Sequence, residues 1–285
     1  MPIPYILFHL LFSGVCLLLA LRLRGRSWAG ACLSLLLGAL WLIGFMIERK
    51  PSWAWAVMRL PGSGWVFVTN LSLEVAVVLM AVLWRSAKDR NAQQRAAVLS
   101  PILVGAALAG YAWFFKPLPP TLTGVATKDG ICFQSTEYSC SAAAAVTLLA
   151  RHGIQVTEAQ MAALCLTRAD LGTSSLGLYR GLSLAAASAA LRPRLSYIGP
   201  PANLRHATYP CIISVGLKSD CSPVIRDRMI SFGWQPGVSH SVVLLSAELD
   251  GTWVLVSDPS NGRERWPVGD LDYLWDGYAL VLTNR

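Results

Sequence analysis

Charged residues are scarce in this sequence, at 14% of 285 residues, whereas 54% are hydrophobic and the mean hydropathy is +0.48. So little charge excludes an ordinary soluble enzyme over the whole length. Four apolar runs in the first half also lack the polar face that a helix of a soluble bundle needs. Each is long enough to cross a bilayer core of roughly 30 Å. The sequence therefore predicts an α-helical transmembrane bundle of about four spans over residues 1–116, namely Ile3–Leu21, Trp28–Ile47, Gly64–Trp84 and Ala96–Phe115.

A basic stripe with interleaved aromatic residues, the usual sign of a nucleic-acid-binding surface, is missing as well. The formal charge of +8 is concentrated in one part of the chain. Residues 1–116 hold 11 basic and three acidic residues, and the remaining residues hold 13 of each. The charge is therefore interpreted as a membrane-topology signal, and nucleic acid is excluded as a partner.

The basic residues between the expected spans predict an orientation. The first and third connections carry seven of them and the second carries three, which places the first and third in the cytoplasm. Everything after Lys116 is then expected outside the cytoplasmic membrane of a bacterium, facing a secreted or membrane-tethered substrate. If Pro51–Leu60 crosses the membrane instead of lying at its surface, the orientation inverts. The lipid bilayer and a separate secretion or export system are the partners that this arrangement implies.

Two polar residues within the third expected span, Asn70 and Glu74, lie four apart on one face. An ionisable residue at membrane depth is a functional candidate, which would suit a transporter with an accessory domain. An interhelical hydrogen-bond pair that holds the bundle together explains them equally well.

Seven cysteines bear on the redox environment. Cys16 and Cys32 fall inside expected spans, where they serve as small apolar residues. With Cys140 reserved for chemistry, the other four are enough for two disulfides in an oxidising compartment, Cys211–Cys221 and Cys132–Cys165. The alternative is that they are reduced core residues of a cytoplasmic domain.

The second half has the patterns of a folded α+β domain over residues 131–285, after a proline-rich linker over residues 117–130. Three helices come first, at Ser141–His152 with Ser139 as N-cap, at Thr157–Leu166 and at Ser175–Leu191. Strands follow at Cys211–Leu217, His240–Leu249 and Thr252–Pro259, with edge strands at Arg263–Val268 and Tyr278–Asn284. Asp250-Gly251 predicts a hairpin between the second and third strands.

Three side chains from these elements have the chemistry of a thiol hydrolase. Cys140 stands at a helix start, where backbone N–H groups stabilise a thiolate. His240 opens one strand of the predicted hairpin and Asp258 ends the other, so the two are expected to meet. They suit the roles of nucleophile, base and orienting acid, and the amide of Gln134 suits that of oxyanion donor. Each residue alone has a commoner structural explanation, and only the set points to catalysis.

The segments "CFQSTEYSCSAAAAVTLLARHGIQVT", "DLGTSSLGLYRGL", "HSVVLLSAELDGTWVLVSDPSNGRERW" and "LWDGYALVL" resemble bacteriocin-processing, double-glycine leader peptidases, a papain-like cysteine peptidase family. The resemblance spans about Ile131 to Leu282. It implies Cys140 as nucleophile, His240 as general base, Asp258 as orienting acid and Gln134 in the oxyanion hole. It implies no metal and no organic cofactor.

Three departures from that family stand out. Ser141 follows the cysteine where the family usually has glycine. Lys218–Ser239 is longer than the family's step from strand to histidine, which suits a lid or a substrate-selecting loop. No phosphate-binding Gly-Lys-Ser/Thr loop occurs, so these residues hold no ATP-driven exporter.

The sequence thus predicts a membrane-anchored cysteine peptidase. A non-catalytic module that docks leader peptides, and a transpeptidase that uses the same acyl-enzyme, are the alternatives.

Overall fold

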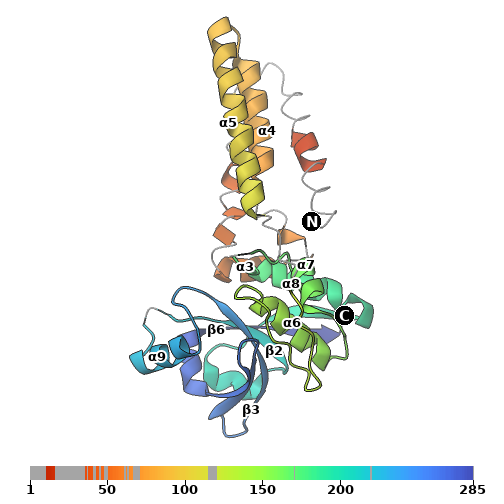
Figure 1. The fold of residues 1–285 in the computed structure, drawn as a ribbon, viewed down its shortest axis with the longest axis vertical. Helices are drawn as coiled ribbons and strands as arrows, with labels where there is room; N and C mark the ends of the chain where they lie inside the picture. Colours follow the sequence, from red (N-terminus) through yellow and green to blue (C-terminus); the bar gives the residue numbers. More distant parts are fainter. Residues whose placement is uncertain are drawn as a thin grey trace. The chain divides into compact units, whose positions relative to one another are not determined.

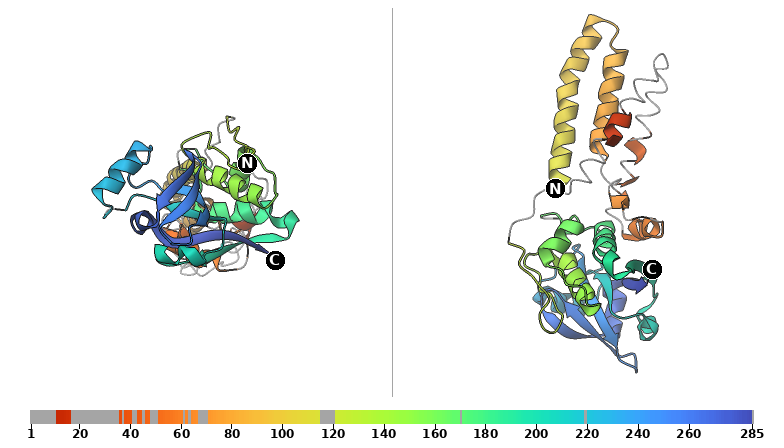
Figure 2. Two further views of the ribbon diagram at one scale, coloured as in Figure 1. Left: turned by 90° about the horizontal axis from the view of Figure 1, so that it is seen from below. Right: turned by 90° about the vertical axis from the view of Figure 1, so that its right-hand side faces the viewer.

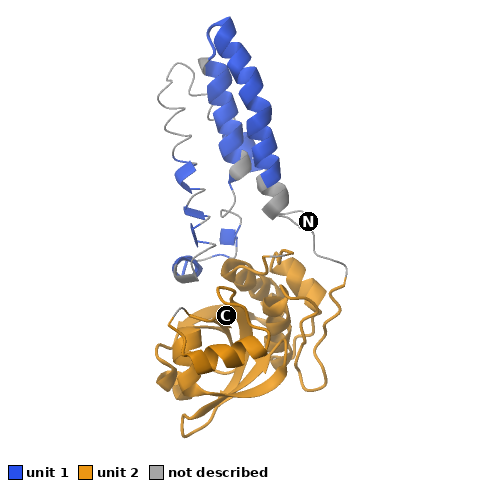
Figure 3. Ribbon diagram, turned by 60° about the vertical axis from the view of Figure 1, so that its left-hand side comes forward, with its two compact units in different colours: residues 1–117 blue, residues 118–285 orange. Residues whose placement is uncertain are grey.

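The structure is a computed structural model that describes residues 11–16, 36, 38–40, 43–44, 46–47, 51–60, 62, 64–66, 71–114, 121–169, 171–218 and 220–284. The chain divides into two compact units, Met1–Pro117 and Leu118–Arg285 (Figure 3). The first unit contains the helices α3 (Pro51–Met58), α4 (Ser72–Ser86) and α5 (Arg90–Phe114). Trp84 Nε1 on α4 donates to Ser100 Oγ on α5 at 2.9 Å, so these two helices lie side by side.

The expected transmembrane bundle is contradicted. No helix among the described residues is both long and apolar enough to cross a membrane. α4 has 15 residues, which rise about 22 Å, short of a bilayer core of roughly 30 Å. α5 is longer but begins with the polar stretch Arg90–Arg95. Most of the first two expected spans lies outside the described residues, and the expected location in a bacterial membrane stays a prediction.

The predicted polar pair of the first unit is described only in part. The Glu74 side chain is fully buried on α4. Asn70 lies outside the described residues, so its pairing with Glu74 stays a prediction.

The second unit combines helices with one antiparallel sheet, as the sequence predicts for this half (Figure 1). The six strands are β1 (Leu191–Tyr197), β2 (Cys211–Val215), β3 (His240–Ala247), β4 (Trp253–Asp258), β5 (Gly262–Pro267) and β6 (Trp275–Asn284). Their order across the sheet is β1-β6-β2-β3-β4-β5. The predicted edge strand Tyr278–Asn284 therefore lies inside the sheet, because β1, which the sequence analysis did not predict as a strand, pairs with it along its outer side.

Three helices precede the sheet and lie together on one side of it (Figures 1 and 2). They are α6 (Cys140–Arg151), α7 (Glu158–Leu164) and α8 (Ser175–Ala185). α6 packs against β2, β3 and β4. The short elements η2 (Ala187–Ala189), η3 (Pro201–His206), η4 (Val268–Asp270) and α10 (Leu271–Leu274), with the helix α9 (Pro223–Ser231), complete the unit.

The alternation of side chains explains how the sheet is buried on both faces. Residues i and i+2 of a strand point to the same face. Val242 and Leu244 of β3 join a core cluster with Trp266 of β5 and with Met229 of α9. Ser241, which directly precedes Val242 in β3, points the other way and bonds to α6. The sheet thus has the helix α6, which carries Cys140, on one face and the segment around α9 on the other.

Candidate active site

The thiol of Cys140 lies at the first residue of α6, as the sequence predicts, and its side chain is 8% exposed. Ser139 precedes the helix, but its hydroxyl bonds to Thr136 instead of capping the helix. Residues Cys140 to Leu149 of α6 are all buried, so packing holds the helix start in place. The first backbone N–H groups of a helix have no acceptor within the helix, which leaves them available to an anion beside the thiol.

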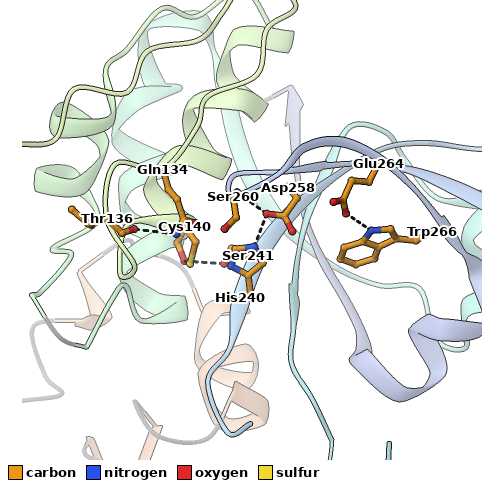
Figure 4. A network of polar contacts seen from close by, with 10 residues as sticks. Gln134, Thr136, Cys140, His240, Ser241, Asp258, Ser260, Glu264 and Trp266 are labelled. Atoms are coloured by element: carbon orange, nitrogen blue, oxygen red, sulfur yellow. Dashed lines mark hydrogen bonds and ion pairs between the residues drawn. The ribbon is translucent and has the colours of Figure 1, made fainter. Parts of the chain in front are cut away.

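His240 begins β3 and Asp258 ends β4, and the structure brings their side chains together. His240 Nε2 lies 2.8 Å from Asp258 Oδ1 (Figure 4). The Asp258 side chain is fully buried, and its Oδ1 also accepts from Ser260 N at 2.7 Å. Because Nε2 is held by the carboxylate, Nδ1 is the ring nitrogen that remains for the thiol. The arrangement orients the imidazole between an acid and a sulfur.

The Cys140 thiol and the His240 imidazole shift each other's pKa in opposite directions. Burial by itself raises the pKa of Cys140, but a hydrogen bond with His240 and the imidazolium charge outweigh it, so the pKa lies below the ordinary value of 9.0. Burial by itself lowers the pKa of His240, but its hydrogen bonds with Asp258 and Cys140 raise that pKa to about 10. Between the two pKa values the site holds a thiolate and an imidazolium.

Gln134 lies beside Cys140, in the turn that leads into α6 (Figure 4). Its backbone N–H donates to Pro259 O at 2.9 Å, which ties the turn to the end of β4. One N–H of its amide donates to Thr136 O at 3.1 Å. A primary amide has a second N–H, which is available to an oxyanion formed at the thiol. Its Oε1 is buried and has no hydrogen-bond partner among the described residues.

Three aromatic and acidic residues behind His240 escaped the sequence analysis. The ring of Trp234 meets that of His240 edge-on at 5.3 Å between centroids and that of Trp266 at 5.7 Å. Glu264 accepts from Trp266 Nε1 at 2.6 Å, and burial, then the charge of Asp258, raise the pKa of its carboxyl (Figure 4). Trp234 belongs to the segment Lys218–Ser239, which the sequence suggested as a lid; no short motif indicates its contact with His240.

The other described cysteines are free thiols, which contradicts the two suggested disulfides. Cys132, Cys165 and Cys211 are buried, and burial is the main cause that raises the pKa of each to about 12. Thiols of this kind are poor nucleophiles at neutral pH, so Cys140 differs from them in its electrostatic surroundings. No cluster of three His, Cys, Asp or Glu residues suited to a metal ion occurs in the described part of the chain.

A cysteine at a helix start, held beside a histidine that an acid orients, has the chemistry that a thiol hydrolase requires. No protein-family model matches the sequence, and no curated protein matches it either.

Solved structures do match, at low identity. A double glycine motif protease from an AMS/PCAT transporter, in complex with a leader peptide, is 22% identical. The match covers 60% of this chain and 99% of that one, with a TM-score of 0.41. The peptidase domain of Streptococcus ComA, a bifunctional ABC transporter of a quorum sensing pathway, is 18% identical over 57% and 99% of the chains, with a TM-score of 0.41. The N-terminal peptidase C39 like domain of a toxin secretion ATP-binding protein from Vibrio parahaemolyticus is 14% identical over 53% and 98%, with a TM-score of 0.36.

Proposed function

We propose that this protein is a cysteine peptidase that hydrolyses a peptide bond through Cys140, His240, Asp258 and Gln134. One observation carries the proposal, namely the His240 imidazole held by Asp258 Oδ1 at 2.8 Å, beside the Cys140 thiol, whose pKa it lowers. The pairing supplies a thiolate nucleophile and a proton donor in the same resting site. The resemblance of the sequence to double-glycine leader peptidases suggests, by analogy, a leader peptide with a double-glycine-type cleavage site as the substrate.

The first half of the reaction forms a thioester. The Cys140 thiolate attacks the carbonyl carbon of the scissile bond, and the carbonyl oxygen becomes an oxyanion. In this proposal, the second N–H of the Gln134 amide and the Cys140 backbone N–H at the start of α6 donate to that oxyanion. Losing one such donor typically costs about 2.7–4 kcal/mol of transition-state stabilisation. The C–N bond then breaks as His240 gives its proton to the leaving amine.

The second half releases the acid product. His240, now neutral, removes a proton from water, and the hydroxide attacks the thioester carbonyl. Asp258 keeps the imidazole in the orientation that both proton transfers require and stabilises the imidazolium. The thiolate leaves with the electrons of the C–S bond, and the thiolate–imidazolium pair is restored.

Thiol labelling and peptide cleavage together test this proposal. The full chain is treated with iodoacetamide across a range of pH, and peptides with an internal Gly-Gly are incubated with it and analysed by mass spectrometry. We expect fast labelling that is absent in Cys140→Ala and slower in His240→Ala, and cleavage that both variants lose. Cys221→Ala and His206→Ala are the matched controls, since both residues lie outside the site, and each should keep both activities.

Two results would contradict the proposal. Cys140 that reacts no faster than Cys221 would show that the thiolate is not formed, and peptide binding without cleavage would indicate a docking module. Products joined to an added amine instead of water would assign the acyl-enzyme to a transpeptidase.

A further inference from the structure

The backbone on both sides of the Gln134 side chain is anchored to buried groups. On one side, the Gln134 N–H donates to Pro259 O at 2.9 Å. On the other, the Ser135 N–H donates to Glu158 Oε1 at 2.8 Å, and the Ser135 hydroxyl donates to Glu158 Oε2. The first anchor is the residue directly after Asp258, the last residue of β4. The second comes from α7, a helix that contributes no residue to the proposed chemistry.

Glu158 is an unusual residue in this position because its side chain is fully buried. A buried carboxylate is costly unless its oxygens accept hydrogen bonds. Both oxygens of Glu158 do so, and Oε2 also accepts from Gly124 N at 2.9 Å. All of these donors are neutral groups. They belong to two segments, the turn around Gln134 and the stretch Thr123–Gly124, which is called the strap below.

Glu158 is not needed to cap its own helix. Thr157 is the N-cap of α7 and forms a reciprocal capping box with Gln160. Thr157 Oγ1 accepts from Gln160 N at 3.2 Å, and Gln160 Oε1 accepts from Thr157 N at 2.9 Å. The Glu158 carboxylate is therefore free to reach away from the helix and hold the turn.

The strap packs so closely against the Glu158 carboxylate that a side chain at Gly124 would clash with it. A Cβ atom on Gly124 would lie 2.6 Å from Glu158 Oε2 and 2.6 Å from Phe133 O. The backbone N–H groups of Thr123 and Gly124 also donate to Ser135 Oγ, at 3.1 and 3.2 Å. Strap, carboxylate and turn thus form one hydrogen-bonded unit next to the oxyanion donor.

We infer that Glu158 is a positioning residue that holds the Gln134 amide where the oxyanion forms, an inference that rests on the proposed peptidase function. Glu158 touches neither the thiol nor the substrate and acts through the Ser135 backbone. Its removal affects the transition state more than substrate binding, because the oxyanion exists only after attack. A displacement of about 1 Å at such a group is enough to lower a rate on the order of 100-fold.

The test is a double-mutant cycle between Glu158→Gln and Gln134→Ala, with Glu137→Gln as the matched control. Glu137 is an exposed carboxylate in the same turn. Glutamine keeps the shape of Glu158 but places an amide N–H₂ group where one carboxylate oxygen accepts. We expect Glu158→Gln to lower kcat about 10- to 100-fold with a small change in KM. In the Gln134→Ala background the same change is expected to cost less than about 2-fold, since the donor it positions is gone.

A labelling readout separates positioning from loss of structure. The iodoacetamide rate of Cys140 reports the thiolate and does not require Gln134, so Glu158→Gln should leave it within about 2-fold of wild type while kcat falls. Should Glu158→Gln fail to fold, Ser135→Ala removes only one donor to the carboxylate and provides the same cycle with a smaller effect.

Equal losses in both backgrounds, a labelling rate that falls together with kcat, or no loss of kcat would each overturn the inference. A wild-type protein that labels rapidly and cleaves no peptide would overturn the proposed function instead, and the inference with it. A loss of kcat in Glu137→Gln equal to that in Glu158→Gln would also overturn it, because the effect would then come from charge in the turn.

Discussion

The hydroxyl groups of Ser141 and Ser241 lie 2.8 Å apart in the buried contact between α6 and β3. Ser141 follows the proposed nucleophile Cys140, and Ser241 follows the proposed base His240. The bond therefore joins α6 and β3 one residue away from the two groups proposed to react. Double-glycine leader peptidases, which the sequence resembles, usually have glycine after the cysteine, whereas this chain has Ser141. The structure gives the Ser141 hydroxyl a hydrogen-bond partner in Ser241.

Removing this bond is expected to weaken both stability and nucleophile. Ser141→Ala deletes one hydroxyl and leaves Ser241 Oγ buried, at a cost of about 1–3 kcal/mol in the free energy of unfolding. The Ser141 hydroxyl also lowers the pKa of Cys140, so the pH at which labelling begins should rise. Urea unfolding and iodoacetamide rates against pH measure the two effects. Ser183→Ala, which removes a hydroxyl bonded to Tyr179 O on α8, is the control and should leave the labelling curve unchanged.

The dependence of kcat/KM on pH should be bell-shaped. Activity requires Cys140 deprotonated and His240 protonated. Since the pKa of Cys140 lies below 9.0, the acid limb should be centred at a lower pH than the ordinary pKa of a thiol. Since the pKa of His240 is raised to about 10, the alkaline limb should lie near that pH. A profile that rises only through pH 9 and shows no alkaline limb would contradict the thiolate–imidazolium pair.

Asp258→Asn should move the alkaline limb to lower pH. Asparagine keeps the size of the side chain but removes the charge and hydrogen bond that raise the pKa of His240. Its amide can also stabilise the wrong tautomer of the imidazole, an effect worth about 10⁴ in kcat in a Ser-His-Asp enzyme. We expect a fall in kcat of at least about 10-fold. Steady-state kinetics over a pH range that extends above the alkaline limb of the wild type would show both effects, and Asp227→Asn on α9 is the control.

The ring of Trp234 is expected to shield the base from water. It is 8% exposed and meets His240 edge-on. Trp234→Phe keeps an aromatic ring and should retain most activity, whereas Trp234→Ala should open the site to water and lower kcat/KM. Burial lowers the pKa of His240, so exposing the ring in Trp234→Ala should raise that pKa and move the alkaline limb to higher pH. Trp253→Ala on β4, where the ring faces Arg265, should do neither.

Much of the catalytic half follows from local sequence. Thr157 and Gln160 predict the start of α7 because a capping box is formed by neighbouring residues. Asp250 and Gly251 predict the hairpin, although the structure joins β3 and β4 through the longer stretch Glu248–Thr252. Two antiparallel strands joined in this way must bring His240 and Asp258 to the same end of the pair.

Other features depend on contacts between distant residues, which no local pattern encodes. β1 contains Pro193 and alternating arginines, so it has no strand-like apolar pattern, yet its pairing with β6 makes it a strand. Long apolar runs in the first half suggested membrane spans because run length alone says nothing of where a helix begins and ends.

The sequence by itself determined which residues are proposed to react and most of the elements that carry them, because helix starts, hairpins and strand periods are set by residues a few positions apart. Only the tertiary structure decided what surrounds those groups. Three contacts illustrate this. Trp234 meets His240, six positions away, and Ser141 bonds to Ser241, 100 positions away. Glu158 accepts from the Ser135 N–H, 23 positions away, in the turn that carries Gln134. Such contacts form when segments of the fold pack against one another, and they surround the groups proposed to react.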